Sequence, residues 1–400
     1  MQENALLKVS NDVTWTGVHD KDIVTFDIVM ETKFGTTYNA YFIEAEKKTL
    51  IDTVKSTFWD TYREKLEQLT DLSEIEYIIC THTEPDHSGS LKYVLEKAPD
   101  ATVVGSGQAL NYLSEMIETP FKSLKVKDGD ELDLGNKTLR FISAPNLHWP
   151  DSIYVYLEED KLLFTCDSFG AHFSDERMFD DLVDNYDEAF KYYFDVILKP
   201  YSKFMLKAID KIKDLPINTL CTGHGPILRT TWRSRVEQSR TMAADYLETT
   251  SGDNRVLVAY ISAYGYTKTM AEQIAEGIHE NKDLTVELAD IEKMLLGDME
   301  QKLVNADAVI IGSPTINQNT LLPIYKFFSV MNPIRDKGKP AAVFGSYGWS
   351  GEAVKLIEAH LANLKFDIRN TISAKFFPTS DKEADFKEFG RNFGASLVKK

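Results

Sequence analysis

Continuous apolar runs in the last third of the chain constrain its fold more than any other feature. The runs VLVAYI (256–261), AVII (308–311) and AAVFG (341–345) show no alternation of polar and apolar residues, which is typical of strands buried on both faces. After the first run, Met270 and Ile274 begin an apolar spacing of four residues, which predicts a helix. Strands of this kind separated by helices predict a doubly wound parallel sheet.

The residues before this region follow another pattern. Short runs rich in β-branched and aromatic residues alternate with turns and helical stretches, which predicts a layered α/β body. The predicted strands are 40–45, 49–52, 76–80, 102–106, 139–144, 153–157, 162–167 and 219–225, and the predicted helices are 57–69, 107–117 and 231–249. The Ser/Gly/Asp/Asn cluster at 251–254 predicts a turn between two domains, 1–250 and 254–400.

Composition and charge exclude several classes of protein. Hydrophobic residues make up 43% of the 400 residues and charged residues 27%, the balance of a globular chain rather than a disordered or fibrous one. The net charge of −17 argues against nucleic-acid binding, because a phosphate backbone repels it, and a basic partner protein fits better. We find no apolar run of roughly 18 residues and no signal peptide, so we expect no membrane segment and a cytoplasmic location.

The cysteines are Cys80, Cys166 and Cys221. This odd, low number argues against a disulfide framework and favours a reducing compartment. No Cys-x-x-Cys pair occurs, so the sequence carries no zinc-ribbon or rubredoxin-type module. Each cysteine lies within three residues of a candidate metal ligand described below. We expect small, buried strand residues, although a redox role remains open.

The segment HTEPDH (82–87) concentrates side chains that bind metals. His82, Glu84, Asp86 and His87 fall within six residues, directly after a predicted strand. A turn at a strand end can aim several side chains at one point. This segment therefore predicts the main part of a metal site.

Later predicted strands also end near metal-binding residues, namely His148, Asp167 and His224. Four imidazoles and three carboxylates are too many for one tetrahedral ion, so we expect two ions with Asp167 as the bridge. This mixture of nitrogen and oxygen ligands suits iron. His172 either donates to the site from outside the ligand set or lies on the surface.

Loops rich in glycine and hydroxyl residues follow the buried strands of the second domain. The first of them runs into the predicted helix, where backbone N–H groups can hold a phosphate, although it lacks the GxGxxG and GxxxxGK[ST] patterns. The expected binding residues are Ser262, Ala263, Tyr264, Gly265, Tyr266 and Thr267 in the first loop, Ser313, Pro314, Thr315, Ile316 and Asn317 in the second, and Ser346, Tyr347, Gly348, Trp349, Ser350 and Gly351 in the third.

Each half of the chain resembles a known family. The order His-x-Glu-x-Asp-His with later His, Asp and His resembles the metallo-β-lactamase superfamily, except that Glu84 replaces the usual second histidine. Within that superfamily this pattern resembles flavodiiron proteins. The first loop of the second half resembles the FMN phosphate loop of flavodoxins, with Tyr266 where many have asparagine. By the same resemblance, the other loops enclose the isoalloxazine ring, with Tyr347 or Trp349 against it.

Together the two halves resemble a flavodiiron protein (A-type flavoprotein), and GTTYNAY (35–41), LHWPDS (147–152) and FGSYGWSGE (344–352) match that family's usual sequence. The resemblance implies a metallo-β-lactamase-like αββα sandwich followed by a flavodoxin-like doubly wound sheet, in the minimal two-domain form. It also implies FMN, a diiron site whose ligands are the seven residues above, and a terminal reductase.

In that family, electrons from a donor, typically rubredoxin, enter at FMN and pass to irons that reduce O₂ to water, NO to N₂O, or both. The resemblance further implies a head-to-tail homodimer or a dimer of dimers, with each FMN beside the partner's irons. The sequence leaves open which gas and which donor are used. A dinuclear zinc hydrolase with a flavodoxin appendage is the main alternative, against which Glu84 and the flavin loops argue. A non-enzymatic electron carrier is another, although no metal ligand is missing.

Overall fold

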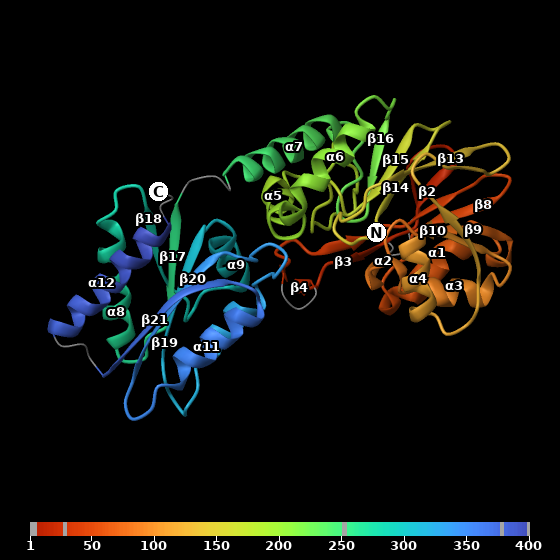
Figure 1. Cartoon of the computed structure of the whole chain (residues 1–400). Coiled ribbons are helices and arrows are strands. Elements are labelled where there is room, and N and C mark those ends of the chain that lie inside the picture. The colour runs from red at the N-terminus through yellow and green to blue at the C-terminus, as the bar shows by residue number, and fades with distance from the viewer. Residues whose placement is uncertain (1–5, 27–29, 250–253, 377–379, 398–400) are drawn as a thin grey trace. The chain divides into compact units, whose positions relative to one another are not determined.

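The chain forms two compact units, shown in Figure 1. The computed structural model describes residues 6–26, 30–249, 254–376 and 380–397. One unit comprises 1–24 and 32–247, and the other comprises 25–31 and 248–400. Most of the predicted turn, residues 251–253, lies outside the described residues, so this boundary stays a prediction. The sequence did not indicate that 25–31 groups with the second unit, where β4 (Thr25–Phe26) pairs with β5 (Met30–Glu31).

Two sheets form the middle of the first unit (Figure 1). The seven-stranded sheet has the order β1 (Leu7–Lys8), β2 (Val13–Trp15), β7 (Tyr41–Ile43), β8 (Lys48–Ile51), β9 (Ile75–Ile79), β10 (Thr102–Ser106) and β11 (Lys122–Val126). The five-stranded sheet has the order β12 (Glu131–Asp133), β13 (Thr138–Ser143), β14 (Ile153–Leu157), β15 (Leu162–Cys166) and β16 (Thr219–Thr222). One apolar core contains Ile79 and Val104 of the first sheet and Phe141 and Phe164 of the second. The two sheets therefore pack face to face.

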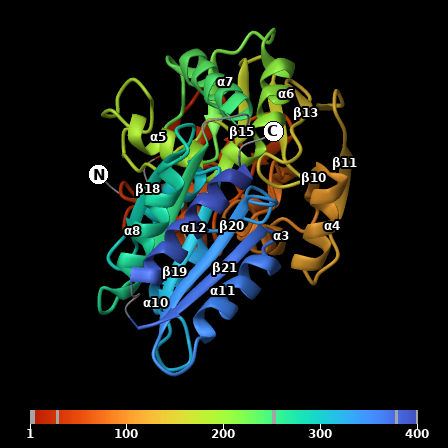
Figure 2. The ribbon, with the colours of Figure 1, turned by 60° about the vertical axis from the view of Figure 1, so that its left-hand side comes forward.

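Helices cover the outer faces of this pair of sheets, and Figures 1 and 2 show them on both sides. The helices beside the seven-stranded sheet are α1 (Trp59–Glu67), α2 (Pro85–Ser88), α3 (Leu91–Lys97) and α4 (Gly107–Met116), and those on the other side are α5 (Asp187–Tyr193), α6 (Ser202–Ile212) and α7 (Trp232–Thr249). In α6, Met205, Ala208, Ile209 and Ile212 are buried, the three-and-four spacing of a helix with one apolar face. These layers are the predicted αββα sandwich.

The strands predicted in the first unit are present, with ends that shift by a few residues. The largest difference is the strand predicted at 219–225, which ends at Thr222. Gly225 has a φ of 74°, a conformation that a strand does not contain. Short, polar or isolated strands were missed, among them β3 (Val18–Asp20), which pairs with β6 (Thr36–Tyr38).

The second unit is built on one parallel sheet of the order β18 (Thr285–Asp290), β17 (Arg255–Tyr260), β19 (Ala308–Pro314), β20 (Pro340–Tyr347) and β21 (Asp367–Lys375). The side chains of β17 alternate between two cores: Val256 and Val258 enter one, and Leu257 and Ala259 enter the other. A strand buried on both faces needs apolar residues at every position, which explains the continuous run. The predicted doubly wound sheet is confirmed.

Helices cover both faces of this sheet (Figure 2). One core contains apolar residues of α9 (Leu296–Val304), α10 (Leu322–Ser329) and α11 (Glu352–Asn363), and the other contains those of α8 (Tyr266–His279) and α12 (Ser380–Leu397). The loops after β17, β19 and β20 lie at the carboxyl edge of the sheet, where open α/β sheets bind their ligands. Among the helices that the structure describes, none is long and apolar enough to cross a membrane.

Candidate metal centre and flavin pocket

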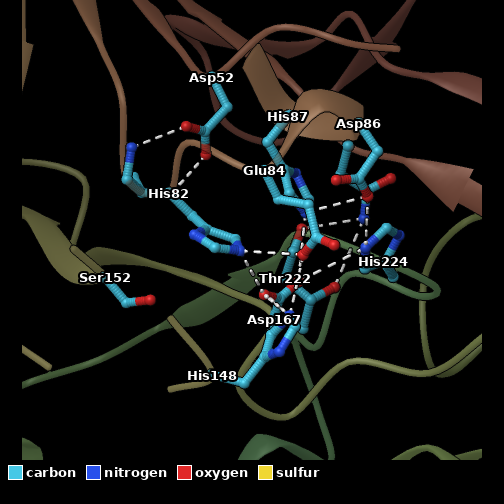
Figure 3. Close-up of polar contacts among 12 residues, drawn as sticks. Asp52, His82, Glu84, Asp86, His87, His148, Ser152, Asp167, Thr222 and His224 are labelled. Carbon is cyan, nitrogen blue, oxygen red and sulfur yellow. Dashed lines mark hydrogen bonds and ion pairs between the residues drawn. The ribbon is translucent and has the colours of Figure 1, made fainter. Parts of the chain in front are cut away.

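The structure brings the seven predicted metal-binding side chains together in the first unit (Figure 3). They come from the loops after β9, β13, β15 and β16 and from α2. Six of these side chains are buried, and the seventh, His148, is half-buried. Pro85 occupies the first position of α2, where its missing N–H costs no hydrogen bond. The helix thereby places Asp86 and His87 on its first turn.

One set of side chains gathers around Glu84 (Figure 3). Glu84 Oε2 lies 3.2 Å from His82 Nε2 and 2.9 Å from His148 Nε2. Asp167 Oδ2 lies 3.4 Å from His82 Nε2 and 3.6 Å from His148 Nε2. The ligand atoms of these four residues all lie within 4.8 Å of one another, so one ion can contact all of them.

A second set gathers around Asp86. Asp86 Oδ2 lies 3.4 Å from His87 Nε2 and 3.2 Å from His224 Nε2. Asp167 presents its other oxygen here, with Oδ1 3.2 Å from His87 Nε2 and 3.4 Å from His224 Nε2. Asp167 therefore offers one oxygen to each set, which is the geometry of a bridging carboxylate.

The donor chemistry of the two sets fits a pair of cations. Both carboxylate oxygens of Asp86 and the Oδ2 of Asp167 are buried and accept no hydrogen bond among the described residues. Buried carboxylate oxygens without donors are costly, and a cation between them removes that cost. Nitrogen and oxygen ligands in this proportion suit a first-row transition metal such as iron.

The electrostatics keep two of the carboxylates, Asp167 and Glu84, ionised. Burial alone would raise the pKa of Asp167, but the imidazoles of His224, His82 and His87 hold it well below its usual range. For Glu84, His148 and His82 likewise outweigh burial and lower the pKa. Asp167 and Glu84 are therefore ionised at neutral pH, the form in which a carboxylate binds a metal.

Two carboxylates outside the predicted set hold the segment around His82. Asp52 accepts the backbone N–H of Thr81 at 2.7 Å, and Asp151 accepts the backbone N–H of Thr83 at 2.8 Å. The other oxygen of Asp151 lies 3.4 Å from His82 Nδ1, so it orients the ring whose Nε2 faces the centre. Sequence reasoning missed both carboxylates, although Asp151 lies in the quoted segment LHWPDS.

His172 and Trp149 lie behind the ligands rather than among them. His172 is buried, with Nδ1 2.9 Å from the Thr36 hydroxyl, which lies 3.4 Å from His224 Nδ1. Of the two positions that the sequence left open for His172, the structure has the one outside the ligand set, next to the site. The rings of Trp149 and His82 meet edge to face, with centroids 5.2 Å apart, so Trp149 forms part of the wall beside this ligand.

The cysteines are all free and buried. Cys166 is near the centre, with its sulfur within 4.8 Å of the ligand atoms of His87 and Asp167. Burial, reinforced by the charge of Asp167, raises the pKa of Cys166 well above its ordinary value. The protonated thiol is a poor nucleophile and a poor metal ligand, which favours the structural interpretation of this residue.

The flavin loops of the second unit surround a pocket of about 540 Å³, a size typical of cofactor sites. Its lining contains predicted residues from all three loops and two residues that were not predicted, Gln318 and Phe376. The predicted residues in the lining are Tyr264, Tyr266, Pro314, Thr315, Ile316, Asn317, Ser346, Tyr347, Gly348, Trp349 and Ser350. The other predicted residues, Ser262, Ala263, Gly265, Thr267, Ser313 and Gly351, do not line it.

Some of the non-lining residues shape the loops instead. Gly265 precedes α8 with a φ of 86°, a conformation that favours glycine, and Ser262 Oγ accepts the N–H of Lys268 at 3.2 Å. The buried hydroxyl of Thr267 lies 2.9 Å from that of Ser346, which joins the first loop to the third. The loop and the start of α8 thus offer backbone N–H groups to an anion, as the FMN phosphate requires.

The rim of the pocket is aromatic and exposed. Trp349 is 84% exposed and Tyr264 is 79% exposed. Phe376 is 54% exposed and follows the edge strand β21, with its N–H bonded to Tyr347 O at 2.8 Å. Sequence reasoning missed Phe376 because this polar, half-exposed strand has no apolar pattern. These rings offer flat faces to an isoalloxazine system.

Known proteins share both halves of this arrangement. A model of the "ODP family beta lactamase" matches residues 36–225, and a flavodoxin model matches residues 258–389. The chain is 38% identical to the flavo-diiron protein FprA2 of Clostridium acetobutylicum, over 98% of this chain and 99% of that protein. It is 33% identical to the anaerobic nitric oxide reductase flavorubredoxin of Vibrio vulnificus, over 96% of this chain and 78% of that protein.

A solved structure has the same architecture. The rubredoxin oxygen:oxidoreductase of Desulfovibrio gigas superposes with a TM-score of 0.80 at 27% identity, over 98% of both chains. The likeness thus extends across both units, each with its own candidate site.

Proposed function

The chain belongs to the flavodiiron protein family, and from this premise we propose that it is a terminal reductase. In this proposal, electrons from a separate donor pass through FMN to two irons, which reduce O₂, NO or both. Relatives of both kinds support this range, since one is named a nitric oxide reductase and another a rubredoxin oxygen:oxidoreductase. Four electrons and four protons convert O₂ to two waters, and two of each convert two NO to N₂O and one water.

One observation carries the proposal: the ligand side chains form two sets that share Asp167, one oxygen to each set. We assign His82, Glu84 and His148 to one iron, Asp86, His87 and His224 to the other, and Asp167 to both. When bound, FMN supplies the relay for electrons, and the irons supply the place where the gas is reduced.

The protein's own groups orient the ligands of the centre. Asp151 and Thr37 contact the outward nitrogens of His82 and His224, which fixes the ring nitrogen that faces each iron. The hydroxyl of Tyr193 donates to Asp167 Oδ1 at 3.2 Å. Burial raises the pKa of Tyr193 well above its ordinary value, so this phenol keeps its proton beside the bridging carboxylate.

In the second unit, we assign the three loops to FMN. The backbone N–H groups after Ser262 and at the start of α8 would hold its phosphate, and Trp349 and Tyr347 would lie against the ring. The proposed donor is rubredoxin or a similar small redox protein. The free, buried thiols fit the reducing cytoplasm that we propose as the location.

The proposal is tested by the iron, zinc and FMN content of anaerobically purified protein, followed by gas consumption with reduced rubredoxin. We expect two irons and one FMN per chain, and consumption of O₂, NO or both. Two zincs and a hydrolytic activity would establish the alternative hydrolase. FMN without metal would make the protein an electron carrier.

The proposed head-to-tail homodimer, or dimer of dimers, rests on the family resemblance. Sedimentation of the loaded protein is expected to give at least a dimer. A fully active monomer would contradict this part of the proposal.

A further inference from the structure

We propose that Asn39 is a positioning residue for His224: it holds the loop at 222–225 so that His224 reaches the second iron. This inference rests on the proposed function, because it concerns the same metal centre. It adds a residue of a distant strand connection that touches neither metal nor gas.

Asn39 contacts the loop on both sides of His224. Its backbone N–H donates to Gly223 O at 2.9 Å. Its side-chain amide Nδ2 donates to Thr222 O at 2.9 Å and to Gly225 O at 3.0 Å. One residue thus satisfies the carbonyls before and after the histidine, and it does so while 1% exposed.

The orientation of this amide is also fixed. Trp15 Nε1 donates to Asn39 Oδ1 at 2.9 Å, so the amide nitrogen must face the loop. The indole is held in turn by Lys65, whose ammonium lies 4.3 Å from the ring centroid and donates to Gly17 O at 2.6 Å. The amide cannot turn over without leaving buried polar groups unpaired.

The loop at 222–225 needs contacts from other segments because it has few groups of its own that could fix its shape. Gly225 has a φ of 74°. A Cβ on Gly223 would come within 2.9 Å of His87 Cε1 and of the Cys166 carbonyl carbon, so no side chain fits there. Glycines leave a chain flexible unless other groups fix it. The segment around His82 is likewise held from outside, by Asp52 and Asp151.

The neighbouring residue Thr37 also contacts His224 and its loop. Its carbonyl accepts His224 Nδ1 at 2.6 Å, and its hydroxyl accepts the N–H of Gly225 at 2.8 Å. Thr37 therefore sets the rotation of the ring, whereas Asn39 sets the position of the loop. Neither contacts the set around Glu84, so the loss of Asn39 is expected to weaken one iron site and not the other.

The test compares Asn39→Asp with the wild type and with Asn111→Asp, a matched change on the exposed face of α4. Asn39→Asp keeps the shape of the side chain but replaces its two donors with a charged oxygen that faces two carbonyls. Iron titration should show the second iron bound about 10–100-fold more weakly, the range for loss of an outer-shell partner. The first iron and FMN should be unchanged, and at an iron concentration that fills only the first site, the magnetic coupling of an iron pair should be absent from the spectrum.

A milder variant and a double variant complete the test. Trp15→Phe keeps Asn39 but removes the indole N–H that fixes the orientation of its amide. It should therefore weaken binding of the second iron by a smaller factor than Asn39→Asp does. In Asn39→Asp, addition of His148→Ala should release the remaining iron, because His148 belongs to the other set. Circular dichroism reports whether each variant is folded.

The outcomes separate this inference from the proposed function. A wild type that does not bind two irons would remove the proposed function itself. Two irons in the wild type and two equally tight irons in Asn39→Asp and Trp15→Phe would overturn the role of Asn39 alone. Equal weakening of both irons, or unfolding of both variants, would also overturn it, because the role would then be general stability.

Discussion

The metal centre and the flavin pocket are built in opposite ways. The metal centre consists mostly of buried side chains, and some of its imidazoles have a polar partner behind them, such as Asp151 behind His82. The flavin pocket consists of loops with exposed rings, among them Trp349. Charges buried together need fixed partners, whereas a flat cofactor at a sheet edge needs backbone donors and ring faces. Changes in the first site should therefore affect stability and metal together, and changes in the second should affect flavin alone.

The largest effect is expected from removal of the shared carboxylate. Asp167→Ala deletes an oxygen from both sets, so we expect fewer than two irons per chain and loss of gas reduction by more than about 100-fold, while FMN stays bound and reducible. Elemental analysis and flavin absorbance measure the two sites in one sample. Retained gas reduction would refute the bridging role.

Acid should act on the first unit through His19. Burial, reinforced by Lys65 and Lys21, lowers the pKa of His19 to about 4. The folded state then binds fewer protons than the unfolded state between about pH 6.5 and 4, so stability is complete above this window and falls through it. The loss reaches about 3 kcal/mol at most.

The measurement is the pH dependence of unfolding in the wild type and in His19→Gln, both loaded with metal. In His19→Gln, the free energy of unfolding should fall less steeply between about pH 6.5 and 4 than it does in the wild type. Release of FMN from the second unit should have the same pH dependence in both proteins. An unchanged slope in His19→Gln would show that other groups cause the acid sensitivity.

A smaller effect is expected at the flavin ring. Trp349→Ala removes an exposed face of the pocket, and an aromatic pair contributes about 0.5–1.5 kcal/mol, so FMN should bind roughly 3–10-fold more weakly. Iron content and the unfolding temperature should not change. A fall in either would mean that the two sites are not separable as described.

The smallest effect is expected at Phe376, which lies at the rim of the pocket. Phe376→Ala should weaken FMN binding by no more than about threefold, because Phe376 is not one of the residues that we assign to the face of the flavin ring. Fluorescence titration of the flavin measures this change. An effect larger than that of Trp349→Ala would make Phe376, and not the tryptophan, the main ring contact.

The sequence predicted the parts of each site whose chemistry lies in the residue itself. His82 and Glu84 could be recognised because a metal requires such side chains, and VLVAYI because burial on both faces requires an apolar run. Asn39, Asp52 and Asp151 could not, because an amide or a carboxylate gains its role only from the loop that the fold places beside it. Asn39 lies more than 180 residues from the loop that it holds.

The sequence was also less informative about segments that are partly exposed to solvent. The edge strand β21 has half-buried and exposed positions in no regular order, with only Ala374 buried among its residues, so Phe376 after its end had no pattern to mark it. The strand predicted at 219–225 was too long because the residues after Thr222 are closely packed but do not continue the strand. Cys221 and the residues before it have the pattern of a strand. At Gly223, however, the backbone lies so close to His87 that a side chain would not fit.

The central claim is that seven side chains hold two irons with Asp167 between them. Anomalous diffraction at the iron edge, from crystals of anaerobically purified protein, tests it directly. We predict two iron peaks in the first unit, one beside Glu84 and one beside Asp86, with an oxygen of Asp167 on each. A single peak, or two peaks that respond at the zinc edge instead, would contradict this account.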